Sequence, residues 1–144
     1  MSTSTETGSA PTILLVDDDD MLRRLLSRVL REEGLRVLEA GNGDIALKVA
    51  RGLTRPPTVV LTDVAMPVMD GFRFARIFRS LYPSVPILFM SGGLPQGPGS
   101  TLPYTGAGLL LKPFRNEALL ETVAAVIEVN PLRSSGGAPS SSAA

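Results

Sequence analysis

The sequence predicts an α/β fold, a doubly wound parallel sheet of five strands in the order 2-1-3-4-5. Short apolar runs alternate along the chain with segments whose apolar residues recur at helical spacing. The middle runs, Thr58–Thr62 and Pro86–Met90, show little alternation between apolar and polar residues, which is typical of strands covered by helices on both faces. These two observations predict successive strand–helix units around one sheet.

Each unit carries its own signals. Thr12–Val16 is the first expected strand, and the helix after it begins at aspartates suited to its N-terminus and ends at Gly34. Arg36–Ala40 is less apolar, so we expect it at a sheet edge. Pro56-Pro57 precedes the third strand, and Met69-Asp70-Gly71 precedes the third helix. The last two strands are expected at Pro86–Met90 and Gly108–Leu111. The helical residues expected to face the core are Leu22, Leu25, Leu26, Val29 and Leu30; Ile45, Ala46, Val49, Ala50 and Leu53; Phe74, Ile77, Phe78 and Leu81; and Leu119, Leu120, Val123, Val126 and Ile127.

One segment does not fit this alternation. Residues 94–104 hold three prolines and two glycines in eleven residues, which no regular α-helix tolerates. We therefore expect helix 4 to be degenerate. Residues 1–11 and 130–144 are rich in Ser, Gly, Pro, Thr and Ala and are expected to be disordered tails. The single domain is then residues 12–129.

Composition excludes several kinds of chemistry. The 144 residues include no cysteine and no histidine, which rules out disulfides, thiolate chemistry, structural zinc and imidazole catalysis. The formal net charge is zero, so neither nucleic acid nor a membrane is expected as an obligatory partner. No apolar run reaches the roughly 18 residues of a membrane span, and the N-terminus does not resemble a signal peptide. A cytoplasmic location is the simplest expectation.

Charged residues follow three of the expected strands. Asp17 and Asp18 follow the first, Asp63 follows the third and Lys112 follows the fifth. The carboxyl ends of parallel strands lie at one edge of a sheet, where open α/β sheets bind ligands. Clustered carboxylates repel and are costly to bury unpaired, so this edge implies a counter-ion and a phosphate. Lys112 is one of only two lysines among fourteen basic residues. Its position is equally consistent with a need for a compact positive charge there and with chance.

Four motifs in this order resemble the receiver domain of two-component response regulators, which has a flavodoxin-like fold. The resemblance covers about residues 12–129. The motifs are Leu15-Val16-Asp17-Asp18, Leu61-Thr62-Asp63 with Met66-Pro67-Val68-Met69-Asp70-Gly71, Met90-Ser91-Gly92, and Leu111-Lys112-Pro113-Phe114. Each motif is weak alone, but all four at this spacing form a strong signal.

The resemblance implies a role for each site residue. Asp63 would accept a phosphoryl group from a histidine kinase or phosphotransfer protein, and Ser91 and Lys112 would contact that group. Asp17, Asp18, Asp63 and the backbone carbonyl of Ala65 would hold Mg²⁺. The Lys112–Pro113 peptide is expected to be cis. Such a protein catalyses only its own phosphorylation and dephosphorylation, so it is not an enzyme in the ordinary sense. Of the neighbouring acidic residues, Asp19 and Asp20 are expected to cap a helix, and Asp70-Gly71 is expected to form a turn.

Three positions depart from the family's pattern. Ala65 and Gly93 replace side chains that tune dephosphorylation, so Ala65→Asn is expected to change the phosphoryl lifetime. Leu109 stands where the family often has an aromatic switch residue. With the segment 94–104 lacking a helix, we expect phosphorylation to act on the loop 92–105 through Ser91.

The leading functional hypothesis is a single-domain response regulator that signals through protein–protein contacts. Met1 and the low-complexity ends favour a free-standing protein over a piece of a hybrid histidine kinase. A pseudo-receiver that binds partners without phosphorylation is disfavoured by the complete acidic set and mildly favoured by the lost helix. A phosphatase of the haloacid-dehalogenase type is also conceivable, because Asp17-x-Asp19 imitates its nucleophile and acid. However, Met21 replaces its small β-branched residue, and a later acidic pair is absent.

Overall fold

The computed structural model describes residues 10–92 and 108–129. The strands are β2 (Thr12–Val16), β3 (Arg36–Ala40), β4 (Val59–Asp63), β5 (Ile87–Ser91) and β6 (Gly108–Leu111). The helices in this part of the chain are α1 (Asp20–Glu32), α2 (Gly43–Arg51), α3 (Gly71–Leu81) and α4 (Asn116–Val129).

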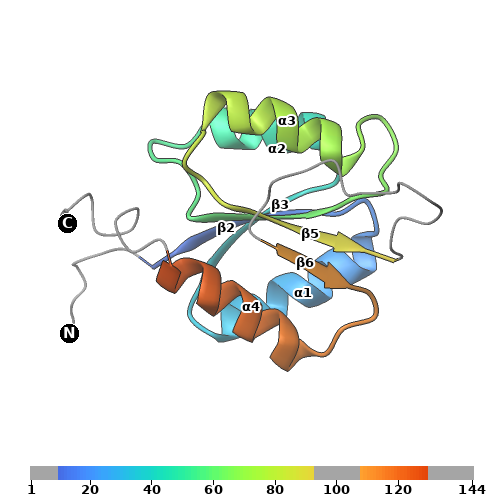
Figure 1. Cartoon of the computed structure of the whole chain (residues 1–144), viewed down its shortest axis with the longest axis vertical. Helices are drawn as coiled ribbons and strands as arrows, with labels where there is room; N and C mark the ends of the chain where they lie inside the picture. Colours follow the sequence, from blue (N-terminus) through green and yellow to red (C-terminus); the bar gives the residue numbers. More distant parts are fainter. Residues whose placement is uncertain (1–9, 93–107, 130–144) are drawn as a thin grey trace.

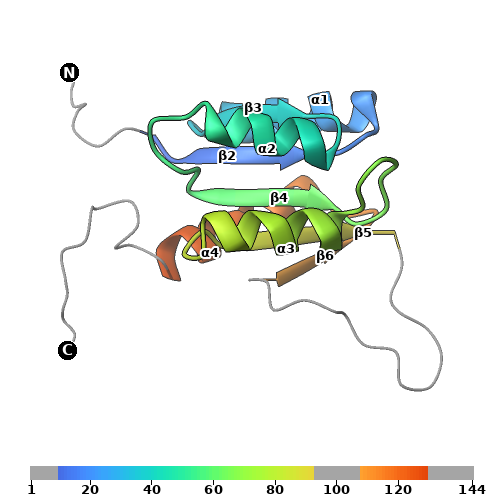
Figure 2. The same cartoon turned by 90° about the horizontal axis from the view of Figure 1, so that it is seen from above.

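The five strands form one parallel sheet in the order β3-β2-β4-β5-β6. Counted along the chain, this is the order 2-1-3-4-5, so the predicted topology is confirmed, as is the edge position of the strand at Arg36–Ala40. Helices α2 and α3 cover one face of the sheet, and α1 and α4 cover the other (Figures 1 and 2). The strand order reverses between β2 and β4, which is where folds of this kind form their sites.

The core lies on both faces of the sheet because neighbouring strand residues point to opposite sides. In β2, Leu14 and Val16 pack with the α2 and α3 side, while Ile13 and Leu15 pack with the α1 and α4 side. All four are fully buried. This double burial explains why the strands read as continuous apolar runs.

Short polar side chains start three of the helices. Asp19, Asn42 and Asp70 each accept a hydrogen bond from a backbone N–H in the first turn of α1, α2 and α3. The Leu22 amide donates to Asp19 Oδ1 at 3.1 Å, and the Arg73 amide donates to Asp70 Oδ1 at 2.8 Å. Gly34 follows α1 with φ +88°, a conformation that glycine adopts without strain. The expected caps and the stop at Gly34 are thus present.

Some expected details are wrong. The third strand begins and ends one residue later than Thr58–Thr62, and the fourth runs Ile87–Ser91 in place of Pro86–Met90. Leu25, Ile45 and Leu81, expected in the core, are 54%, 43% and 45% exposed. Each helix buries only the stripe that meets the sheet, so Leu25 lies beside that stripe, Leu47 is buried where Ile45 was expected, and Leu81 is the last residue of α3.

Several expectations fall on residues outside the described part of the chain. They concern the degenerate helix in 94–104, Gly93, most of the loop 92–105, the N-terminal tail except for residues 10 and 11, and the whole of the tail 130–144. Within residues 10–92 and 108–129, no helix has the length and apolar character needed to cross a membrane.

Candidate phosphoacceptor and metal site

The sheet brings the predicted site residues together at one edge, which is formed by the carboxyl ends of its strands. Asp63 is the last residue of β4 and Ser91 the last of β5, while Asp17 and Lys112 directly follow β2 and β6. Backbone hydrogen bonds continue past the strand ends, from the Asp17 amide to the Ala40 carbonyl (3.1 Å) and from the Lys112 amide to the Ser91 carbonyl (2.7 Å). The side chains at this edge therefore project from a fixed backbone frame.

Lys112 crosses the end of β5 to reach two carboxylates. Its Nζ lies 3.3 Å from Asp63 Oδ2 and 3.5 Å from Asp17 Oδ2. The side chains of Asp17, Asp63 and Lys112 are 0%, 11% and 22% exposed, so these ion pairs are shielded from bulk water. Lys112–Pro113 is cis, as expected.

Asp17 is held on every polar side. Its Oδ1 accepts the Asp19 amide at 2.9 Å, its Oδ2 faces Lys112, and its carbonyl accepts Arg23 Nη1 at 2.8 Å. Burial raises the pKa of Asp17 above its ordinary value of 3.8, and the charge of Asp63 acts in the same direction. The Asp19 amide and Lys112 oppose that rise in pKa. One lysine therefore does not fully offset the cost of ionising Asp17 beside Asp63.

Three carboxylates at this edge suit a divalent cation. Asp17, Asp18 and Asp63 each offer an oxygen atom, and these atoms lie within 4.8 Å of one another. An ion bound about 2.1 Å from each carboxylate oxygen would need these oxygens within about 4.2 Å of one another, so they would have to approach one another only slightly. With Lys112 as the neighbouring cation, the cluster carries two net negative charges, which one Mg²⁺ would neutralise. The oxygen-only donor set is the kind that Mg²⁺ prefers, so the residues present fit the ion.

The other predicted residues fall into two groups. Ser91 is half-buried on the same edge, and Ala65 is exposed in the loop that follows Asp63. Asp18 is exposed beside the buried Asp17. Asp19 and Asp20 are directed to α1, where Asp19 caps the helix and Asp20 pairs with Arg23 at 2.8 Å.

The sequence matches the response regulator receiver domain family over residues 13–124. This match spans well over half of the chain. The chain belongs to the response regulator receiver domain family.

Relatives of this receiver domain occur both alone and within larger proteins. It is 34% identical to the response regulator receiver protein CpdR of Brucella abortus, across 77% of this chain and 92% of CpdR. It is also 34% identical to the sensor kinase CckA of the same organism, but there it spans only 13% of the relative. The response regulator protein FleR of Pseudomonas aeruginosa is also much longer, since this chain is 36% identical to it but spans only 24% of its length.

Solved structures agree with this assignment. The chemotaxis protein CheY4 of Vibrio cholerae is 34% identical, with a TM-score of 0.68 over 81% of this chain and 98% of CheY4. The receiver domain of the hybrid histidine kinase CckA is 32% identical, with a TM-score of 0.69 over 81% of this chain and 98% of that domain. The flavodoxin-like α/β fold of two-component receivers is thus confirmed.

The loop after Asp63 is tightly folded in this receiver domain. The Val64 amide donates to both Asp63 Oδ1 (2.9 Å) and the Met90 carbonyl (3.0 Å), and the Gly71 amide donates to the Val64 carbonyl (2.7 Å). Between them, Val68 has φ +71°, and the Met69 amide donates to the Pro67 carbonyl at 2.7 Å across it. This is a γ-turn centred on a β-branched residue, a strained conformation.

Sequence reasoning missed Arg23. Its side chain is only 14% exposed, and besides the Asp17 carbonyl it contacts Asp20 and Glu39 (Nε to Oε1, 3.1 Å). Burial acts to lower the pKa of Arg23, but its bonds to Asp20 and Glu39 raise it overall. The sequence shows Arg23 beside Arg24, which is exposed, and no signal in one sequence separates the two.

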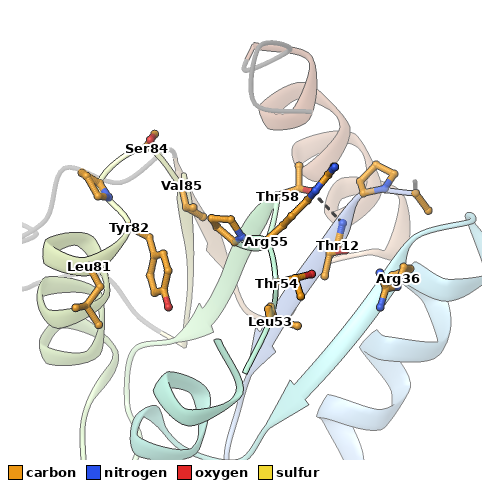
Figure 3. Close-up of a pocket in the computed structure, with 14 residues that line it drawn as sticks. Thr12, Arg36, Leu53, Thr54, Arg55, Thr58, Leu81, Tyr82, Ser84 and Val85 are labelled. Carbon is orange, nitrogen blue, oxygen red and sulfur yellow. Dashed lines mark hydrogen bonds between the residues drawn. The ribbon is translucent and has the colours of Figure 1, made fainter. Parts of the chain in front are cut away.

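A pocket of about 680 Å³ lies at the opposite edge of the sheet (Figure 3). It is lined by the start of β2, by Arg36, and by the loops before β4 and β5. Within it the Thr12 amide donates to Thr58 Oγ1 at 3.0 Å. Two arginines line the pocket and no carboxylate does, so its chemistry is unlike that of the acidic cluster. Pocket size alone therefore does not locate the site of this receiver domain.

Proposed function

We propose that this receiver domain accepts a phosphoryl group on Asp63 from a histidine kinase or a phosphotransfer protein. Asp17, Asp18, Asp63 and the Ala65 carbonyl would hold the Mg²⁺ on which the transfer depends. The phosphorylated domain would then signal through a contact with a downstream protein. The receiver family supports this proposal, since its members are signalling modules of two-component systems.

One observation carries the proposal. Asp63 is nearly buried at the sheet edge, with Lys112 Nζ 3.3 Å from its Oδ2 and two further carboxylates within ligand distance. A carboxylate with only a structural role would be paired and neutralised. Asp63 shares a single lysine with Asp17, so this edge keeps an excess of negative charge that favours a metal ion.

The chain's residues divide the work of phosphoryl transfer. A carboxylate oxygen of Asp63 attacks phosphorus, the bond from phosphorus to the donor's imidazole nitrogen breaks, and that nitrogen keeps the electron pair and takes a proton from water. Lys112 remains beside the new acyl phosphate and offsets its charge. The Ser91 hydroxyl, on the neighbouring strand end, would donate to a phosphoryl oxygen.

Mg²⁺ held by Asp17, Asp18, Asp63 and the Ala65 carbonyl would offset the negative charge of the phosphoryl group during transfer. The protein's part is to hold the ligands in place. Asp17 is fixed by its hydrogen bonds, and Asp63 is oriented by the Val64 amide at 2.9 Å. Such fixed donors and charges need little rearrangement during the reaction.

Incubation with Mg²⁺ and acetyl phosphate, followed by intact-mass measurement, tests the proposal. The expected result is a gain of one phosphoryl group, about 80 Da, that is lost in Asp63→Asn. Asp44→Asn is the matched control, because Asp44 is an exposed carboxylate paired only with Lys48 at 3.5 Å among the contacts of the described residues. It should be phosphorylated like the wild type.

The same experiment separates the alternatives. A wild-type protein that gains no mass from acetyl phosphate or a phosphohistidine donor would be a pseudo-receiver. Steady release of phosphate from unrelated esters would indicate a phosphatase. A mass gain that persists in Asp63→Asn would place the acceptor elsewhere and overturn the proposal.

A further inference from the structure

Arg23 connects the acidic edge to the rest of the fold. It leaves the first turn of α1, and Nη1 donates to the Asp17 carbonyl at 2.8 Å. Nε binds Glu39, which lies on β3 next to Ala40. The Ala40 carbonyl in turn accepts the Asp17 amide. The backbone of Asp17 is therefore fixed on both sides, by β3 directly and by Arg23 through Glu39.

Glu39 is itself held in place. Its other oxygen lies 3.7 Å from Arg31 Nη2, and Arg31 also donates to the Val37 carbonyl at 3.0 Å. Glu39 is 24% exposed and Arg23 is 14% exposed, which distinguishes their contact from surface ion pairs of small energetic effect. A planar guanidinium can serve Asp17, Asp20 and Glu39 together, whereas an ammonium group has no such fixed fork.

We propose that Arg23 is a positioning residue for Mg²⁺, acting through the peptide that joins Asp17 to Asp18. By fixing the Asp17 carbonyl, it sets the direction in which the chain leaves the buried Asp17 and presents the exposed Asp18. The inference rests on the proposed function in one respect, namely that these carboxylates hold the metal ion.

Charge and position predict opposite effects for this residue. Arg23 is a cation close to a site for a cation. If it acted only through its charge, its removal would tighten Mg²⁺ binding. If it positions the two carboxylates, its removal weakens binding, by about tenfold for a residue that supports metal ligands in this way. The direction of the change therefore decides between the two effects.

The test measures Mg²⁺ affinity by calorimetry on Arg23→Gln, Arg23→Lys and Glu39→Gln, with Arg28→Gln as control. Arg28 lies on the same helix, is 78% exposed and pairs with Glu32 at 3.3 Å, so its loss changes the charge without touching the site. We expect about tenfold weaker binding in Arg23→Gln and a clear loss in Arg23→Lys, which keeps the charge but lacks the fork. Arg28→Gln should bind like the wild type.

Further measurements separate this inference from other failures. Unfolding in EDTA shows whether each variant is folded. If Arg23→Gln does not fold, Glu39→Gln tests the same inference, because it removes the carboxylate that holds Arg23 and should also weaken Mg²⁺ binding. Phosphorylation from acetyl phosphate at saturating Mg²⁺ should return to near the wild-type rate in Arg23→Gln. Wild-type protein that binds Mg²⁺ but gains no phosphoryl group would defeat the proposed function and leave the inference intact. Unchanged or tighter Mg²⁺ binding in Arg23→Gln, wild-type affinity in Arg23→Lys, or no Mg²⁺ binding by the wild type would overturn it.

Discussion

Gly71 should tolerate no larger residue without a cost, because α3 begins directly against the backbone at the end of β4, the strand that ends at Asp63. A Cβ atom added to Gly71 would overlap the Asp63 carbonyl oxygen and would lie 2.9 Å from Val64 Cα and 3.0 Å from the Asp63 carbonyl carbon. All three are backbone atoms, so no side chain can turn away to make room. Gly71→Ala must therefore move either the start of α3 or the end of β4.

The size of the effect follows from these contacts. Adding a methyl group to a packed site costs about 1–3 kcal/mol, and clashes with backbone belong at the upper end of that range. Alanine regains up to about 1 kcal/mol over glycine in a helix. We therefore expect Gly71→Ala to lower the free energy of unfolding by about 2 kcal/mol. A shift of Asp63 should also slow phosphorylation about tenfold or more, because misplacement by about 1 Å costs up to about 10²-fold.

Gly52→Ala provides the matched comparison. Gly52 follows α2 with φ −81°, and its added Cβ would come no closer than 3.5 Å to another atom. Alanine there should leave phosphorylation unchanged and raise stability by about 0.5 kcal/mol. Urea unfolding and intact-mass kinetics with acetyl phosphate measure both quantities. Equal stability and equal rates for Gly71→Ala and the wild type would refute the reasoning.

Three further predictions concern Asp17, two exposed residues of α1, and Val68 in the loop after β4. The pKa of Asp17 is raised in the folded state above its ordinary value of 3.8, so this carboxyl stabilises the fold at low pH, and that contribution is lost as the pH rises through the folded-state pKa. Asn at this position does not titrate. In EDTA, Asp17→Asn should therefore gain stability relative to the wild type as the pH rises from about 4 to 7. Urea unfolding at several pH values measures this, and a difference independent of pH would contradict it. Met21 and Leu25 lie one turn apart on α1 and are 81% and 54% exposed, so replacing both with Ser should slow transfer from a phosphohistidine donor about tenfold while acetyl phosphate still reacts normally. An equal decrease in the phosphorylation rate with both donors would contradict the prediction that Met21 and Leu25 form a docking surface for the phosphohistidine protein. Val68→Asn should stabilise the domain by about 1 kcal/mol in thermal unfolding, because Asn tolerates the positive φ that strains Val68; a lower melting temperature would contradict this.

The sequence was sufficient to predict the fold because the middle strands are apolar on both faces and the first and third helices have clear start or stop signals. Apolar runs located the strands to within one residue, and the aspartates and Gly34 located the ends of α1. Helix faces were predicted less well. Leu25 and Ile45 continue an apolar pattern, but the sheet covers a narrower stripe than the pattern suggests. Only the packed structure shows how wide that stripe is.

The site could be predicted in outline for a related reason. Residues at the carboxyl ends of parallel strands must meet, so Asp17, Asp63 and Lys112 were brought together by topology alone. Arg23 could not be found in this way, because it acts from a helix and through a backbone carbonyl. A contact of this kind leaves no motif in a single sequence. The strain at Val68 is equally hidden, since a valine in a loop has no distinctive signature.

The run of four aspartates illustrates why residues of one type need separate explanations. Asp17 is fully buried and Asp18 is exposed at the acidic edge, while Asp19 caps α1 and Asp20, which is 70% exposed, pairs with Arg23. Two negatively charged side chains contact the Arg23 guanidinium: Asp20 Oδ1 lies 2.8 Å from its Nη1, and Glu39 Oε1 lies 3.1 Å from its Nε. Without them, a largely buried guanidinium beside Asp17 would repel any cation bound at the acidic cluster. With them, Arg23 donates to the Asp17 carbonyl while its positive charge is balanced locally, so the cluster keeps the excess of negative charge that suits a divalent cation.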